Sequence, residues 1–375
     1  MAIPFFKRYI YIYKMSNHKS GKNILEHINN SPVIGILTLP ISSWLGENVN
    51  LKKRKAKSYL PAAWVKWIEN SGARVVPIQY NATKPILLSY FSQINGMIIC
   101  GDIAQINYAE LDKDAKLDEE IIRWMKAAYI VFQYATQQNN RGIYFPLLGI
   151  GIGYEELVFM KTKPKYYEGL TSSNSALLFK GDELPSDEMV QIADEYKSGV
   201  LKFTDTPGIF GKQISKKNRT LWSKTNMLYT TPGWGLNNKG KSVKKLHEFL
   251  EINAIGKNNK FKTEFITIYS FKDMPFYGFS FHPEAVIYDW VDRAIPQNDE
   301  EVKFSQKLSE LFVNECRKNT VELLSDKILI YNYTLFSPEK VLKLLYPDNW
   351  QTVQLKKRFT NAYFFGIPFP ELRKM

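Results

Sequence analysis

The sequence has few of the residues from which disulfide scaffolds and metal centres are built. It contains two cysteines, Cys100 and Cys316, and four histidines among 375 residues. Two cysteines cannot form a disulfide framework, and we expect no metal site and no cofactor. No stretch of about 18 residues is both apolar and uncharged, so we expect no transmembrane segment. With 45% hydrophobic and 23% charged residues, the chain has the composition of a folded globular protein.

Acidic residues are also scarce relative to basic ones. The chain has 50 Lys and Arg against 37 Asp and Glu, a net charge of +13. Such a balance favours an anionic partner. The basic runs at 52–57, 239–245 and 356–358 lack the aromatic and glycine pattern of a nucleic-acid module, so nucleic acid is not the partner we expect. We expect protein subunits of a larger complex, with anionic lipid or an acidic surface as the other contacts of the basic patches.

The first 25 residues contain no acid; the first one is Glu26. A secretory signal needs an apolar core of about 7–15 residues, which is absent here. A basic, acid-free start is typical of a mitochondrial targeting segment. An ordinary basic tail fits equally, and the sequence leaves both interpretations open.

From Val33 onward, short apolar strands alternate with amphipathic helices. This alternation predicts an α/β fold, a mostly parallel central sheet with helices on both faces. Ligands of such sheets sit at the carboxyl ends of the strands. We expect strands at 33–39, 74–79, 97–100, 144–149, 261–269, 276–281 and 328–335, and helices at 59–70, 84–93, 117–136, 241–252, 304–315, 338–345 and from Tyr154.

Four segments in one order carry a family resemblance. They are PVIGIL (32–37), AWVKWIENSGARVVP (63–77), LGIGIGYEEL (148–157) and FHPE (281–284). Together they resemble γ-glutamyl hydrolase, a branch of the class I glutamine-amidotransferase-like fold. The resemblance covers about residues 31–335, which leaves a basic N-terminal extension at 1–30 and a C-terminal extension at 336–375.

The resemblance implies a cysteine hydrolase of the γ-glutamyl tails of folates. In that family a cysteine sits on a strand-to-helix elbow of pattern G-x-C-x-G-x-E, where the helix N-terminus favours its thiolate. Here the elbow runs from Gly149 to Glu155, and Gly151 stands at the nucleophile position. His282 and Glu284 match the family's activating histidine and its carboxylate. Glu155 matches the elbow glutamate.

Two further positions depart from the family pattern. The oxyanion turn reads P-G-G in the family, and here it reads Cys100, Gly101, Asp102. A carboxylate beside a developing oxyanion opposes catalysis. The family also has a histidine two residues before a central tryptophan, whereas Trp234 follows Pro232 and Gly233. We assign Gly101, Asp102, Glu155 and Trp234 to a residual binding crevice.

Loss of the nucleophile leads to our main hypothesis, a catalytically inactive family member that serves as a structural subunit of a large assembly, in mitochondria. The alternatives are a γ-glutamyl hydrolase that uses Cys100 or a water activated by His282, and a protein that binds a glutamate-like ligand. The resemblance implies a lysosomal, vacuolar or secreted protein, and a cytoskeletal location is a further alternative. Cys100 and Cys316 are otherwise expected to be buried packing residues.

Overall fold

The structure is a computed structural model. It describes residues 28–41, 57–101, 117–171, 189–193, 197–205, 208–230, 233–239, 243–258, 263–290, 292–337, 339–340 and 360–366.

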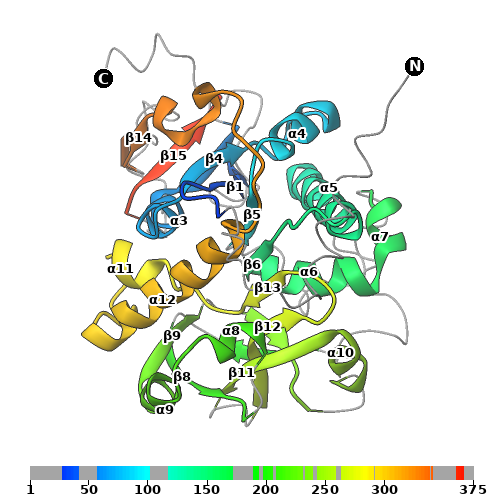
Figure 1. Cartoon of the computed structure of the whole chain (residues 1–375). Helices are drawn as coiled ribbons and strands as arrows, with labels where there is room; N and C mark the ends of the chain where they lie inside the picture. The colour runs from blue at the N-terminus through cyan, green and yellow to red at the C-terminus, as the bar shows by residue number, and fades with distance from the viewer. Residues whose placement is uncertain are drawn as a thin grey trace, which may run out of the picture.

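A nine-stranded sheet forms the centre of the molecule (Figure 1). Neighbouring strands are parallel from β4 to β13 and antiparallel from β13 to β9. The expected α/β class is confirmed, with an antiparallel half added to the parallel one. The strands lie in the order β4 (Arg74–Ile78), β1 (Val33–Leu37), β5 (Gly96–Gly101), β6 (Leu147–Gly151), β13 (Phe276–Phe279), β12 (Thr263–Phe271), β11 (Leu250–Asn258), β8 (Lys197–Phe203) and β9 (Asn226–Thr230).

Seven of the described helices form two groups, and the helices of each group contact one another. The first contains α3 (Ala62–Glu69), α11 (Ala285–Tyr288) and α12 (Asp299–Cys316), and the second contains α4 (Lys84–Phe91), α5 (Glu119–Asn140), α6 (Ile152–Thr162) and α7 (Pro164–Glu168). Figure 1 shows the two groups on opposite sides of the parallel strands. The remaining helices, α8 (Ile209–Lys212), α9 (Lys216–Trp222) and α10 (Val243–Phe249), pack beside the antiparallel half.

The long helices begin at strong N-terminal caps. Asp118 accepts the Glu120 N–H at the start of α5. Asn298 and Glu301 form a capping box at the start of α12. Caps of this kind satisfy backbone N–H groups that have no partner within the helix. They fix the starts of two helices that cover opposite faces of the sheet. In the described part of the chain, no helix is both long enough and apolar enough to cross a membrane.

A second sheet joins the two ends of the described chain. Its four strands lie in the order β14 (Leu335–Phe336), β15 (Ala362–Phe365), β3 (Ser58–Pro61) and β2 (Leu39–Pro40). Tyr59 and Leu60 therefore belong to a strand, and their expected place in a helix is wrong. Pro61 is the N-cap of α3, because proline fits the first positions of a helix but not its interior. A two-stranded sheet pairs β7 (Met189–Ala193) with β10 (Gly233–Leu236).

Two other expected elements also differ. Leu250–Ile252 continues β11 rather than the preceding helix, because Leu250 pairs with Phe271 of β12. The run at 328–335 is not a strand but two 3₁₀ turns, η3 (Asp326–Ile328) and η4 (Ile330–Asn332), followed by β14. Most of the helix expected at 338–345 lies outside the described residues.

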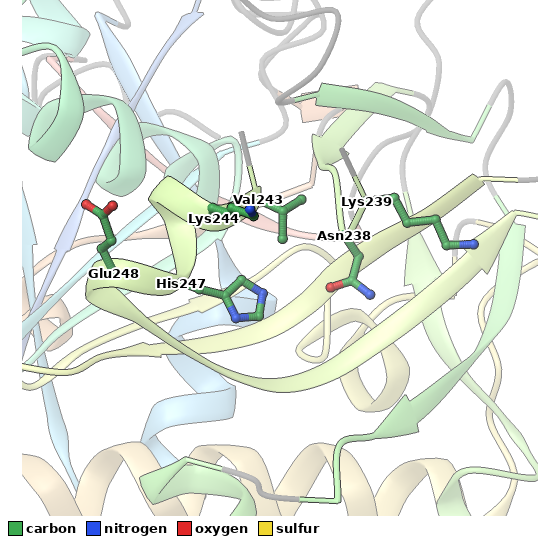
Figure 2. Close-up of a pocket in the computed structure, with 6 residues that line it drawn as sticks. All are labelled: Asn238, Lys239, Val243, Lys244, His247 and Glu248. Carbon is green, nitrogen blue, oxygen red and sulfur yellow. The ribbon is translucent and has the colours of Figure 1, made fainter. Parts of the chain in front are cut away.

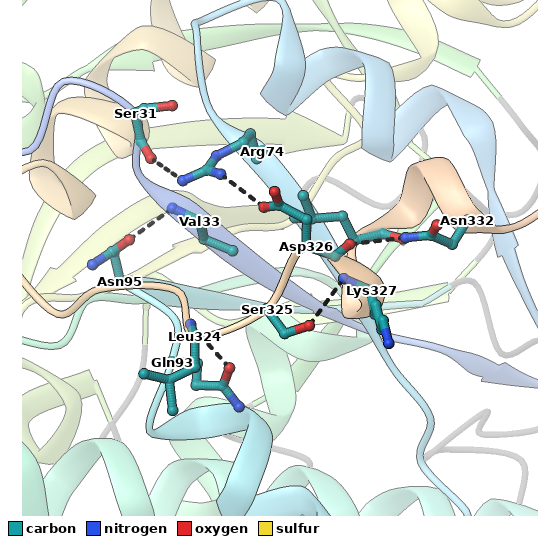
Figure 3. Close-up of polar contacts among 11 residues, drawn as sticks. Ser31, Val33, Arg74, Gln93, Asn95, Leu324, Ser325, Asp326, Lys327 and Asn332 are labelled. Carbon is teal, nitrogen blue, oxygen red and sulfur yellow. Dashed lines mark hydrogen bonds and ion pairs between the residues drawn. The ribbon is translucent and has the colours of Figure 1, made fainter.

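The stretch that follows α12 is tied to the amino ends of the parallel strands (Figure 3). Asn95 accepts the Val33 N–H at 2.7 Å and donates to the carbonyl of Val321 at 2.8 Å. Arg74 donates to the carbonyl of Ser31 at 3.1 Å and pairs with Asp326 at 3.5 Å. These contacts hold the amino edge of the sheet, opposite the carboxyl ends of its parallel strands.

Candidate functional site

The register of three parallel strands places the expected site residues at one edge of the sheet. Gly101 of β5 is the register partner of Gly151 of β6. Ile150 is the register partner of Phe279 in β13, and His282 follows three residues later. The sheet therefore brings Gly101, Gly151 and His282 together at its carboxyl edge, as the sequence motifs predict.

Position 151 keeps the main-chain geometry of an elbow. Gly151 is the N-cap of α6, with φ +59° and ψ −121°. A Cβ atom built there would lie 3.1 Å from Nε2 of His282 and 2.5 Å from the carbonyl oxygen of Gly101. A side chain at 151 would therefore point at His282, but the main chain of Gly101 closes the space around its first carbon.

The glycines on either side of Gly151 are required by packing. A Cβ at Gly153 would overlap the carbonyl oxygen of Ile99 in β5. A Cβ at Gly149 would overlap the main chain of Gly153. The elbow is thus held by close contact between α6 and the strands beneath it, whatever residue stands at 151.

His282 and Glu284 form a buried pair. Nδ1 of His282 lies 2.8 Å from Oε1 of Glu284, and both side chains are buried. The His282 N–H donates to the carbonyl of Tyr229 in β9 at 2.9 Å, and Ser305 of α12 donates to the carbonyl of Pro283 at 2.5 Å. The histidine ring is therefore oriented by the carboxylate, while β9 and α12 hold the main chain.

Asp289 is a second carboxylate beside Glu284, and the sequence motifs give no signal for it. It is buried just beyond α11, and it accepts the Thr360 N–H at 2.8 Å. Burial raises the pKa of its carboxyl from 3.8 to about 6, with a further upward contribution from Glu284. Hydrogen bonds from Thr360 and the field of His282 act in the opposite direction. Asp289 thus links the region before β15 to the segment that carries the His–Glu pair.

Glu155 lies in the first turn of α6 and is buried, with 7% of its surface exposed. Burial raises the pKa of its carboxyl well above the usual value, and the neighbouring charge of Glu156 raises it further. Glu156 is fully buried and accepts a hydrogen bond from Tyr167 at 2.6 Å. The elbow glutamate is therefore a buried group at the start of α6.

Cys100 is a poor candidate for a replacement nucleophile. Its side chain is fully buried in β5, and burial, followed by the charge of Glu284, raises the pKa of its thiol well above the usual value. The thiolate is the reactive form of cysteine, so the environment of Cys100 opposes the chemistry. Cys316 is buried on α12, and its Sγ lies against Gly96.

The structure describes one of two further expected site residues by its main chain only and does not describe the other. Asp102 lies outside the described residues. Trp234 is placed by its main chain in β10, where it pairs with Gln191 of β7, and its side chain is outside the described part. Their assignment to a binding crevice stays a prediction.

The basic run at 239–245 borders a surface pocket of about 440 Å³ (Figure 2). Lys239, Lys244 and His247 line it together with Glu248. Lys239 also forms an ion pair with Glu264 at 3.3 Å. Acidic groups therefore oppose the lysines, and this pocket does not concentrate positive charge. In the described residues, no group of three or more His, Cys, Asp or Glu is placed to hold a metal ion.

Comparison with known proteins agrees with the site geometry. The family Peptidase C26 matches residues 32–161, which include the elbow. "Gamma-glutamyl hydrolase B" of Dictyostelium discoideum is 32% identical over 371 residues, which cover 97% of this chain and 95% of that protein. "Gamma-glutamyl hydrolase" of Homo sapiens is 27% identical and covers 81% of this chain and 84% of that protein.

Among solved structures, the glutaminase domain of Trypanosoma brucei CTPS with bound acivicin is similar to this chain at 11% identity and a TM-score of 0.44. The match covers 80% of this chain and 99% of that one. The near full-length likeness to the Dictyostelium protein, the Peptidase C26 match and the elbow–histidine geometry all point to one family. The chain belongs to the γ-glutamyl hydrolase family.

Proposed function

We propose that this chain binds a γ-glutamyl or glutamate-like ligand at the carboxyl edge of the sheet and does not hydrolyse it through a cysteine. One observation carries the proposal: Gly151 occupies the elbow position that faces His282, with its main chain in elbow geometry and no side chain. Without a thiol there, no thioester can form between the protein and a γ-glutamyl group. Removal of the nucleophile from such a unit costs several orders of magnitude in rate.

The ligand class follows from the relatives. Proteins similar over most of this chain are named gamma-glutamyl hydrolases. The His282–Glu284 pair and the strand ends that would hold a γ-glutamyl group have kept their places. A site without its nucleophile still offers the contacts of its other residues, so binding is the activity that this loss leaves most nearly intact.

A second candidate function is hydrolysis by water, and the geometry of the His282–Glu284 pair favours it. Glu284 orients the imidazole of His282 at 2.8 Å. In this route Nε2 of His282 takes a proton from a water molecule, whose oxygen attacks the γ-glutamyl carbonyl. The resulting tetrahedral species breaks its C–N bond, and the proton on His282 passes to the leaving amine. The names of the relatives favour this alternative over a purely structural role.

The test uses the purified full-length chain and a folate that carries a γ-glutamyl tail. Calorimetry measures binding, and chromatography of the same mixture measures cleavage. We expect saturable binding with no cleavage, and weaker binding in His282→Ala. His247→Ala, which changes an exposed histidine on α10, is the matched control.

Three results would change the proposal. Cleavage by the natural chain that His282→Ala abolishes would establish the water route. Binding that His282→Ala leaves unchanged would place the ligand elsewhere on the molecule. Absence of both binding and cleavage would overturn ligand binding and return weight to the structural hypothesis.

The subunit hypothesis remains a separate prediction, as does the mitochondrial location. The relatives are named as hydrolases, which fits the lysosomal, vacuolar or secreted alternative better. Fractionation of cells by native size and by organelle distinguishes these possibilities. Migration with a large mitochondrial complex supports the subunit, whereas a free monomer in lysosomes, vacuoles or the medium supports the ligand-binding or hydrolytic protein.

A further inference from the structure

A groove runs along α5, far in the sequence from the His–Glu pair. It lies between α4 on one side and α6 and α7 on the other, and its volume is about 820 Å³. We propose that this α5 groove is a docking surface for an acidic amphipathic helix of a partner protein.

The charge of the groove has one sign. Three cations line it, Lys84, Arg141 and Lys161, and no acidic residue does. None of the three has an ion pair within the part of the chain that the structure describes. One acid, Glu168, is held beside the groove by a hydrogen bond from Tyr129 at 3.3 Å. The three cations are thus available to carboxylates of a partner.

Two other cavities show that this is not a general property of a basic chain. In the pocket beside α10, Glu248 and the paired Glu264 oppose the lysines. In the cavity between α9 and α12, Lys303 and Lys307 are paired with Glu300 and Glu310. Acidic residues of the chain offset most of the positive charge in both places. In the α5 groove they do not.

Between the cations, the groove presents apolar side chains together with the exposed amides of Gln133, Gln137 and Asn140 on α5. Leu88 of α4 is 38% exposed, and Ile130 of α5 is half-buried. Met160 of α6 is buried below them. Such a lining suits an amphipathic helix whose apolar residues contact Leu88 and Ile130 and whose carboxylates contact the cations at the rim.

The length of the groove favours a helix over a small anion. Its lining residues on α5 extend from Tyr129 to Arg141, which is about 18 Å at 1.5 Å per residue. The three cations come from separate helices, with Lys84 at the start of α4, Arg141 at the end of α5 and Lys161 in the last turn of α6. Carboxylates spaced along about three helical turns match cations spread over three helices better than a single phosphate or carboxylate does.

The test places a photo-crosslinking residue in the groove of the full-length chain in the cells that make it. In Leu88→p-benzoylphenylalanine, irradiation should yield an adduct with one protein segment, to be sequenced by mass spectrometry. That segment should carry net negative charge and apolar residues at helical spacing. Leu221, a leucine with 41% exposure in the cavity between α9 and α12, carries the same label in the matched control and should not capture this segment.

Charge reversal supplies the second measurement. The triple variant Lys84→Glu, Arg141→Glu, Lys161→Glu should lower the yield of the adduct by about tenfold. The triple variant Lys217→Glu, Lys303→Glu, Lys307→Glu changes the same charge in the α9–α12 cavity and should leave the yield unchanged. Thermal unfolding confirms that both variants fold.

The proposal is overturned by adducts with phospholipid, by adducts with a basic or neutral segment, or by a yield that the groove variant does not lower. It is also overturned if position 88 captures nothing beyond what position 221 captures. Ligand binding at His282 is measured on the same variants and should not change. The groove proposal and the proposed ligand binding are therefore tested independently.

Discussion

Between β6 and α6 the main chain of the elbow is kept although position 151 carries no side chain, whereas after β13 both His282 and Glu284 keep their side chains and their hydrogen bond. The two halves of one site have therefore changed differently. The elbow side has its backbone geometry but no side chain at position 151. The side with His282 and Glu284 has both its backbone and its side chains in place.

The difference shows which features of the site serve the fold. Gly149 and Gly153 allow α6 to lie against the main chain of β5 and β6, so the elbow persists without a nucleophile. His282 and Glu284 are buried with their main chain held by β9 and α12. A buried pair of this kind is costly to break one residue at a time. The presence of glycine instead of cysteine at position 151 breaks no buried pair of this kind.

The largest expected effect comes from breaking the elbow through its packing. In Gly153→Ala the added Cβ overlaps the carbonyl of Ile99, and we expect a loss of about 4 kcal/mol or more in the free energy of unfolding. Gly142→Ala is the control, because nothing lies within 4 Å of a Cβ at Gly142, so the variant adds only the backbone strain of its φ of +80°, which Gly153 does not have. It should lose about 1 kcal/mol. Urea denaturation measures both, and equal losses would contradict the packing argument.

Asp289→Asn tests the side of the site that carries His282 and Glu284. Folding raises the pKa of Asp289 from 3.8 to about 6, so its protonated form stabilises the fold. This contribution is present below pH 3.8 and is lost as the pH rises through 6. Asparagine keeps an acceptor for the Thr360 N–H and does not ionise. The free energy of unfolding of the variant should therefore rise relative to that of the natural chain by about 2 to 3 kcal/mol as the pH increases from 4 to 8.

Urea unfolding at several pH values measures this gain. Asp326→Asn, at an ion-paired carboxylate whose side chain is 82% exposed, should change stability by less than about 0.5 kcal/mol at every pH. A gain in Asp289→Asn that does not vary with pH would show that removal of charge is not its cause.

Restoring a thiol tests the two sides together. In Gly151→Cys the new Cβ meets the carbonyl of Gly101 at 2.5 Å, and we expect a loss of about 1 to 3 kcal/mol. Because the same crowding displaces the sulfur, cleavage of a γ-glutamyl substrate should not return. Gly151→Ala adds the same carbon without the thiol and should lose as much. Turnover in the cysteine variant and not in the alanine variant would show that the thiol is the one group that the site needs for cleavage.

The smallest effect is expected at the native thiols. Cys100 and Cys316 are buried and the pKa of each thiol is raised, so neither should react with a disulfide reagent while the unfolded chain is fully labelled. Absorbance of the released thiolate follows the reaction. A fast-reacting thiol that disappears in Cys100→Ser would reopen Cys100 as the nucleophile.

Local pattern predicted most of the fold, and its errors have tertiary causes. The amphipathic stretch at 59–70 is a helix only after Pro61, because Tyr59 and Leu60 pair with β15, about 300 residues later. Leu250 continues a helical pattern but pairs with Phe271. The apolar run at 328–335 has strand composition, yet η3 and η4 lie outside the sheets. Propensity could not distinguish these cases, since each depends on a distant partner.

For the site, motif order predicted which residues meet. Gly101, Gly151 and His282 do meet at one edge, because the order of parallel strands fixes which strand ends are neighbours. Asp289 and the carbonyl of Tyr229 were not predicted, since neither belongs to a motif and the contacts of both depend on the tertiary fold.

The sequence by itself determined the strand–helix alternation, the family and the absence of a side chain at position 151, because these depend on residue identity and order. Only the tertiary structure decided that the main chain of Gly101 closes over that position, that Cys100 is buried against the field of Glu284, and that one groove concentrates unpaired cations. Distances, burial and charge pairing arise between residues that are remote in the chain, and no local pattern encodes them.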